Sequence, residues 1–201
     1  IPRGAFSAYR KGLKKNGKHD YDGALKAFQK AIKKHKSFSR CYTHIGVIYM
    51  KQGKFKKSEE SFNKAIELNE RDPLPLTGLG ELFCEIKEWK QAIEKLHHAI
   101  EMDSSRAKNY FLLGKAQFNM GNKIEAEKAL VQGLMLQPRE SGESRILLAN
   151  LLIEQERWTD AKLMLKSYLR ENPFAENKND VKNRIREIDQ QIALFSLPPM
   201  E

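Results

Sequence analysis

Residues 76–100 read LTGLGELFCEIKEWKQAIEKLHHAI, and this stretch decides the fold because its pattern recurs along the chain. Leu76, Leu79 and Phe83 share one helical face, and a second apolar stripe begins at Trp89 after a polar turn. The small residue inside the first helix recurs at intervals of 34, 34, 34 and 35 residues, at Gly12, Gly46, Gly80, Gly114 and Ala149. A repeat of this length indicates a stacked array of helix pairs, since one pair cannot bury its apolar face alone.

Three columns of residues support the array. We expect the Gly/Ala ladder to mark the close approach of the two helices of each pair, with a small residue opposite it at Ala24, Ser58, Ala92, Ala126 and Ala161. A third small column is expected to contact the next repeat, at Ala31, Ala65, Ala99 and Gly133. Bulky residues are expected to plug the turn end of each pair, at Tyr21, Phe55, Trp89 and Trp158.

The pattern predicts an all-α fold, a right-handed α-solenoid of five helix-turn-helix repeats with a C-terminal capping helix. The first helix is expected at about residues 5–16 and the capping helix at about 179–195. The expected segments are an entry at 1–4, repeats at about 5–38, 39–72, 73–106, 107–141 and 142–174, a capping segment at 175–196 and a tail at 197–201.

The pattern resembles the tetratricopeptide repeat family over most of the chain. The residues that carry the resemblance include Leu79-Gly80, Phe83, Ala92, Leu96, Ala99, Tyr110, Leu113-Gly114, Ala126 and Pro138. The sequence departs from the family at Lys15 and Gln117, where an aromatic is usual, and at Ser58 and Tyr168, where Ala is usual. A one-residue insertion near residues 140–144 predicts a looser joint at residues 138–144.

Charge is concentrated in the first third of the chain. Of the net charge of +10, residues 1–69 hold 17 Lys and Arg against 5 Asp and Glu, whereas the remainder holds 19 against 21. The basic patch consists of Lys11, Lys14, Lys15, Lys18, Lys26, Lys30, Lys33 and Lys34. Such a patch attracts an acidic protein, an anionic surface or nucleic acid, and the alternative is simple solubility of the array's end. Nucleic acid is disfavoured because arginine forks and stacking aromatics are sparse there.

The sequence offers no motif for chemistry. It contains no phosphate-binding glycine loop and no nucleophile elbow, and the adjacent His97 and His98 point apart on a helix, so we expect no enzyme activity, metal or cofactor. Cys41 and Cys84 match no metal or redox spacing, which favours a reducing, cytoplasmic location. No apolar run is long enough for a membrane span. The start at Ile1 is compatible with a segment of a longer protein.

In the family that the chain resembles, the first helix of each pair lines a concave groove. The resemblance places on that face the residues three before, one after and four after each ladder position: Tyr9, Leu13, Asn16, Thr43, Val47, Met50, Thr77, Glu81, Cys84, Phe111, Lys115, Phe118, Ile146, Asn150 and Ile153. Helix pairing does not require the apolar members, so they favour a groove for a peptide or helix. The alternative is that an inserted segment, the capping helix or a neighbouring subunit covers them.

Some family members clamp a C-terminal carboxylate with Lys, Asn and Arg at fixed positions, and this chain lacks that set. The positions hold Tyr9 and Leu13, then His44, then Leu74 and Gly78 in one register, and the register one repeat later also fails. We therefore expect a non-catalytic scaffold that binds a protein or peptide partner, with the lysine-rich end turned to an acidic partner. The alternatives are a targeting or self-association domain of a larger enzyme or signalling protein, and a nucleic-acid-associated adaptor.

Overall fold

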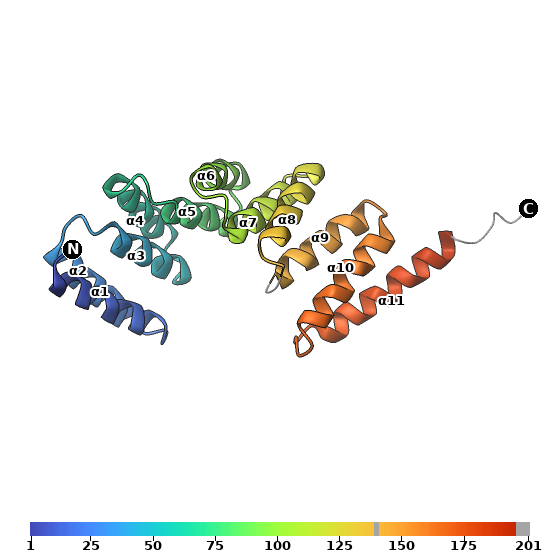
Figure 1. Cartoon of the computed structure of the whole chain (residues 1–201), viewed down its shortest axis with the longest axis horizontal. Helices are drawn as coiled ribbons and strands as arrows, with labels where there is room; N and C mark the ends of the chain where they lie inside the picture. Colours follow the sequence, from blue (N-terminus) through green and yellow to red (C-terminus); the bar gives the residue numbers. More distant parts are fainter. Residues whose placement is uncertain (139–140, 196–201) are drawn as a thin grey trace, which may run out of the picture. The chain divides into compact units, whose positions relative to one another are not determined.

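The computed structural model describes residues 1–138 and 141–195, and these residues form helices joined by short turns (Figure 1). The helices are α1 (Arg3–Asn16), α2 (Tyr21–Lys34), α3 (Ser39–Lys51), α4 (Phe55–Leu68), α5 (Leu74–Glu85), α6 (Trp89–Met102), α7 (Ala107–Asn119), α8 (Lys123–Leu136), α9 (Gly142–Glu154), α10 (Trp158–Glu171) and α11 (Lys178–Phe195). The all-helical fold predicted from the sequence is therefore confirmed for the described part of the chain.

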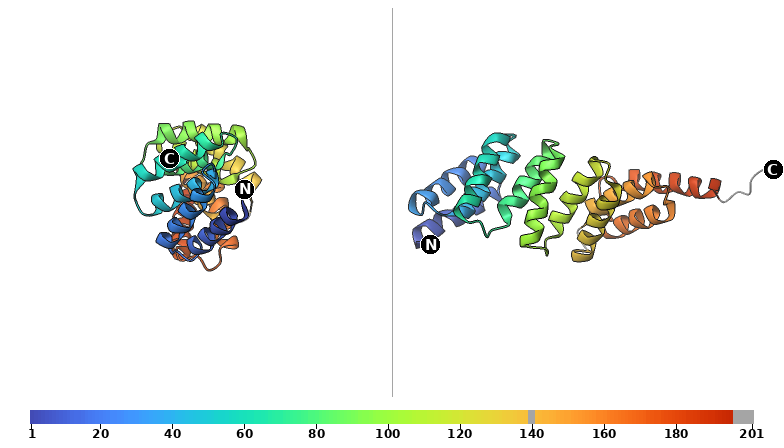
Figure 2. Two further views of the ribbon diagram at one scale, coloured as in Figure 1. Left: turned by 90° about the vertical axis from the view of Figure 1, so that its left-hand side faces the viewer. Right: turned by 90° about the horizontal axis from the view of Figure 1, so that it is seen from above.

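The chain divides into two compact units, Ile1–Ser104 and Ser105–Glu201, which we call unit 1 and unit 2. In unit 1 the pairs are α1 with α2, α3 with α4 and α5 with α6. Each pair also contacts the next, through α2 with α3 and through α4 with α5. In unit 2, α7 pairs with α8, α9 pairs with α10, and α11 packs on α10. Figure 2 shows the paired helices side by side within each unit.

The small-residue ladder lies where the two helices of a pair meet, as the sequence predicted. A Cβ atom at Gly46 would stand 2.8 Å from the Phe62 ring, and one at Gly80 would stand 2.5 Å from Leu96 Cγ. Phe62 and Leu96 are fully buried, so they have no free space into which to move. The glycines therefore set the closeness of the helices, because any side chain there forces the pair apart.

The small column on the second helices includes one polar member. Ser58 is fully buried, and its Oγ donates a hydrogen bond of 2.8 Å to the backbone oxygen of Gly46 in α3. Ser58 therefore takes the usual place of alanine without leaving a buried hydroxyl unpaired.

Two details of the column predictions are wrong. Gly133 faces α7 of its own pair and not the next repeat, since a Cβ there would stand 3.3 Å from Tyr110 Cβ. Phe55 begins α4 but is 38% exposed, so it does not plug the turn end of its pair. The equivalent Tyr21, Trp89 and Trp158 are half-buried.

The turn inside each helix pair contains a residue with positive φ. These residues repeat at the spacing of the ladder: His19, Gly53, Lys87, Gly121 and Glu156. Only two of them are glycine, although glycine adopts this conformation at the lowest cost. The same turn conformation therefore recurs between the two helices of each pair.

The capping helix α11 buries one side against α10. Val181 and Ile188 are buried, and Ile185 and Ile192 are partly buried against the same apolar cluster. Lys182, Arg184 and Arg186 are exposed on the other side. A terminal helix with one apolar and one polar side closes the core of a helical array.

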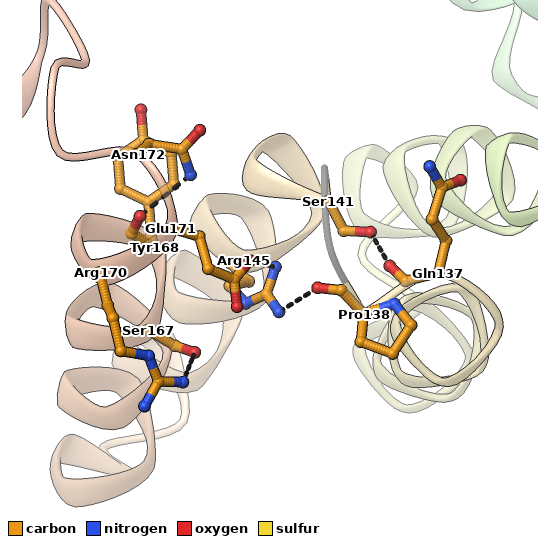
Figure 3. A network of polar contacts seen from close by, with 9 residues as sticks. All are labelled: Gln137, Pro138, Ser141, Arg145, Ser167, Tyr168, Arg170, Glu171 and Asn172. Carbon is orange, nitrogen blue, oxygen red and sulfur yellow. Dashed lines mark hydrogen bonds and ion pairs between the residues drawn. The ribbon is translucent and has the colours of Figure 1, made fainter.

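The predicted joint at residues 138–144 is bridged by a buried cation in unit 2 (Figure 3). Arg145, which is 7% exposed, donates a hydrogen bond from Nη2 to the oxygen of Pro138 and pairs through Nη1 with Glu171 at 2.9 Å. Ser141 Oγ also donates to the oxygen of Gln137, at the end of α8. Residues 139–140 lie outside the described residues, as does the predicted tail at 197–201. The compact units divide at Ser104–Ser105, which is not the position of this joint.

Candidate functional site

Four of the residues expected on the partner-binding face of unit 1 are buried. These residues are Tyr9, Thr43, Thr77 and Cys84. Thr43 donates a hydrogen bond to Ser39 O at 3.4 Å and Thr77 donates one to Pro73 O at 3.3 Å. Because their side chains lie within the packing of the helices, they offer little surface to a partner in this structure.

The other expected residues of unit 1 keep part of their side-chain surface exposed to solvent. They are Leu13, Asn16, Val47, Met50 and Glu81, on α1, α3 and α5. The side-chain oxygen Oδ1 of Asn16 is buried and has no hydrogen-bond partner among residues 1–138 and 141–195.

His44 joins an aromatic cluster that the sequence did not reveal. Its ring stacks on Phe28 with the centroids 5.4 Å apart and the planes at 9°, and its Nε2 lies 3.0 Å from the hydroxyl oxygen of Tyr9. Tyr9 also packs on Phe38 with a centroid distance of 4.9 Å. The cluster connects α1 and α2 with α3. It explains why Tyr9 is covered.

The cluster predicts that unit 1 loses stability in mild acid. Burial lowers the pKa of His44 below its ordinary value of 6.5, Arg40 lowers it further, and Asp72 opposes the shift. The unfolded chain therefore takes up a proton first, and the free energy of unfolding should fall as the pH drops below about 6.5. Urea unfolding at pH 7.5 and pH 5.5, followed by the fluorescence of Trp89 in a Trp158→Phe background, measures this loss.

The matched control for this pH effect is a histidine outside the core. His44→Gln should reduce the difference between the two pH values, whereas His97→Gln, on the exposed side of α6, should leave it unchanged. If the free energy of unfolding changes equally between the two pH values in wild type and in His44→Gln, the role of the cluster is contradicted.

Unit 2 holds six of the expected residues, all partly exposed, on its two first helices. Phe111, Lys115 and Phe118 lie on α7, and Ile146, Asn150 and Ile153 lie on α9; together we call them the α7–α9 face. The two helices contact each other, and all four apolar members pack against the buried core of unit 2 with one side while keeping part of their surface exposed. The face therefore combines a fixed apolar base with two polar side chains.

The lysines of the predicted basic patch lie on α1, on α2 and in the turn between them. All eight are exposed except Lys15, which is partly buried and forms an ion pair with Asp20 at 2.6 Å. This pairing, followed by a backbone hydrogen bond from Gly23, lowers the pKa of Asp20. The unit 1 end of the chain therefore carries a dense positive surface with one carboxylate tied into it.

The described residues contain no group of three or more His, Cys, Asp or Glu side chains placed to hold a metal ion. Cys41 and Cys84 are buried, and burial raises the pKa of Cys41 to about 12, which leaves its thiol protonated and unreactive. Within residues 1–138 and 141–195, no helix is long and apolar enough to cross a membrane.

Comparison with known families gives two matches. The tetratricopeptide repeat family matches residues 39–72, which comprise α3 and α4, and residues 107–140, which begin with α7 and include α8. No curated protein matches the chain in sequence.

Several solved structures share the fold. A thermophilic tetratricopeptide-repeat protein from Thermus thermophilus is 20% identical, with a TM-score of 0.72 over 92% of this chain and 98% of that one. MamA is 25% identical, with a TM-score of 0.69 over 81% of this chain and 94% of that one. YrrB, described as a repeat protein with an unusual peptide-binding site, is 18% identical, with a TM-score of 0.67 over 89% and 92%.

Proposed function

We propose that this chain, which matches the tetratricopeptide repeat family at residues 39–72 and 107–140, is a non-catalytic scaffold that binds a partner peptide or helix on the faces of its first helices. The single observation that carries the proposal is the α7–α9 face of unit 2. YrrB supports the proposal as a protein of the same fold with a peptide-binding site.

The α7–α9 face has the composition of a binding surface. Phe111, Phe118, Ile146 and Ile153 each keep exposed area although they are anchored in the core on one side. Anchored aromatic and aliphatic side chains lose little conformational entropy when a partner covers them, and such residues provide most of the affinity of an interface. Lys115 and Asn150 supply the polar contacts that orient a ligand.

Two alternatives use the same surfaces. A second copy of this chain or another part of a larger protein would cover the α7–α9 face in place of a separate partner. A nucleic-acid adaptor would use the lysines of α1 and α2, but those lysines lack the arginine forks and stacking aromatics that read bases.

The test selects a ligand for the face and then removes the face. A phage-displayed library of random 12-residue peptides is panned on the protein, and the dissociation constant of an enriched peptide is measured by titration calorimetry. Phe111→Ala with Phe118→Ala should weaken binding about 100-fold, because two anchor residues together contribute about 3 kcal/mol. Asn150→Arg should also weaken binding, since it places a charge among the apolar side chains without removing a core contact.

The matched control removes similar apolar surface elsewhere in unit 2. Ile124 and Met135, on α8, are 69% and 71% exposed, and Ile124→Ala with Met135→Ala should leave the affinity unchanged. Circular dichroism melting verifies that each variant is folded. Equal affinity for wild type, the double Phe variant and Asn150→Arg would contradict the proposal, and a mass that doubles with concentration and falls in the double Phe variant would assign the face to self-association instead.

A further inference from the structure

A groove of about 430 Å³ runs between α1 and α2 at the lysine-rich end of unit 1. Five lysines line it, Lys11 and Lys15 from α1 and Lys26, Lys30 and Lys34 from α2. Its remaining lining consists of the small residues Gly4, Ser7, Ala8, Gly23 and Ala27. The groove is therefore lined by small residues and by lysine side chains from both helices.

The α1 side of this groove differs in chemistry from the same side of later repeats. Ser7 and Lys11 occupy positions that in α3, 34 residues later, hold Cys41 and Ile45. Both of those residues are buried, since they pack α3 into the core of unit 1. The first repeat has thus replaced an apolar stacking side with hydroxyl and ammonium groups, which bind anions and not a neighbouring apolar helix.

Most of the positive charge in the groove is unneutralised. Residues 1–34 contain ten Lys and Arg against two Asp. Lys15 is paired with Asp20 at 2.6 Å, whereas Lys11, Lys26, Lys30 and Lys34 form no ion pair within the part of the chain that the structure describes. Lysines that converge on a concave surface reinforce one another's field and so attract a ligand with several negative charges.

The spacing of the lysines matches an extended acidic peptide. Lysines four positions apart on a helix, such as Lys26, Lys30 and Lys34, are separated by about 6 Å along its axis. Alternate side chains of an extended chain point to the same side at a separation of about 6.6 Å. The Lys34 ammonium lies over Gly4 and the Lys15 ammonium lies over Gly23, so the groove itself presents positive charge to a carboxylate.

We propose that the groove between α1 and α2 binds an extended acidic segment of a partner protein, with Asp or Glu at alternate positions facing the lysines of both helices. This inference names the partner chemistry of the lysine-rich end and rests on the scaffold function proposed above. A flat membrane surface cannot enter a groove between two helices, and the all-lysine lining offers point charges to carboxylates without the planar groups that stack on bases.

The test uses a fluorescein-labelled peptide of five Glu-Ser repeats and fluorescence polarisation at 50 mM salt. The groove variant is Lys11→Gln with Lys30→Gln, and its matched control is Lys14→Gln with Lys33→Gln, which removes the same charge from the same two helices outside the groove. The groove variant should bind at least about fivefold more weakly, whereas the control should change the dissociation constant less than about twofold, since one exposed ion pair contributes up to about 1 kcal/mol.

A neutral variant separates shape from charge. Ser7 is exposed and lines the groove, so Ser7→Gln should fill part of the groove without unfolding α1. The substitution should also weaken binding of the alternating Glu-Ser peptide. A peptide of five Glu followed by five Ser should bind more weakly than the alternating one. Three results would overturn the inference: an equal loss of peptide affinity in the groove variant and its control, an unchanged affinity in Ser7→Gln, or no binding of the peptide to wild type.

Three further arms identify other ligands and other failures. Tighter, groove-dependent binding of a ten-residue oligothymidylate, or of phosphatidylserine vesicles, than of the peptide would overturn the proposed class of partner. The selected peptide of the α7–α9 face should bind the groove variant and wild type equally. If the acidic peptide does not bind while the selected peptide still binds the α7–α9 face, this inference alone is rejected. If the acidic peptide binds but no peptide binds the α7–α9 face, the proposed role of that face is rejected.

Discussion

Replacing Gly80 with leucine should lower the free energy of unfolding of unit 1 by about 3 kcal/mol or more. Gly80 lies in α5, and a Cβ atom there would stand 2.5 Å from Leu96 Cγ and 2.6 Å from Leu96 Cδ2. Leu96 is fully buried in α6, so the two helices must separate and open the core. Leucine favours a helix over glycine by about 1 kcal/mol, and this gain is smaller than the cost of the overlap.

The measurement for Gly80→Leu is urea unfolding monitored by the fluorescence of Trp89, in a variant that also carries Trp158→Phe. Trp89 begins α6 in the same pair, so it reports the affected helices directly. Gly17→Ala is the matched control, because Gly17 has helical φ of −64° and a Cβ there has no contact closer than 3.5 Å. The control should be neutral or slightly stabilising. A Gly80→Leu variant as stable as wild type would refute the role assigned to the glycine ladder.

Arg145→Ala should lower the free energy of unfolding of unit 2 by about 3 kcal/mol, the cost typical of removing one partner from a buried ion pair. The side chain of Arg145 is 8% exposed and that of Glu171 is 23% exposed, so water compensates little of the loss. The substitution also leaves the oxygen of Pro138 without its guanidinium donor. The contacts between the end of α8, α9 and α10 should weaken together (Figure 3).

Trp158, observed in a Trp89→Phe background, reports the unfolding of unit 2 in this second experiment. Arg157→Ala is the control, since Arg157 pairs with Glu127 at 2.7 Å and with Asp160 at 3.0 Å but is exposed, and its loss should cost less than about 1 kcal/mol. Arg145→Met combined with Glu171→Leu should restore most of the stability, because neither charge remains buried alone. Equal effects of Arg145→Ala and Arg157→Ala would contradict a buried clamp.

The helix pairs could be predicted from the sequence because their determinants are local and repeated. Gly46 and Gly80 lie at one period, and each faces one large residue sixteen positions later, Phe62 or Leu96. A pattern that recurs five times fixes the helical face that each residue occupies even where single positions vary. Ser58 illustrates the tolerance, since its hydroxyl finds the oxygen of Gly46 and preserves the packing.

The depth of each side chain could not be predicted in the same way. Periodicity gives the direction of Tyr9 on its helix but not that His44, 35 residues later, lies over it. The lysines of α1 and α2 were visible in the sequence, yet the groove also depends on Gly4 and Gly23, over which the side chains of Lys34 and Lys15 lie. Arg145 looked like an ordinary polar position because its partners, Pro138 and Glu171, come from different segments.

The most direct test of the scaffold function places a photoreactive benzophenone amino acid at Lys115, between Phe111 and Phe118 on α7. The same group at the exposed Lys128 of α8 serves as the control. Irradiation with the peptide selected from the library, followed by mass spectrometry, identifies the cross-linked position. We predict efficient cross-linking from position 115 and little from position 128. Cross-linking that is equal at the two positions, or stronger at position 128, would contradict partner binding on the α7–α9 face.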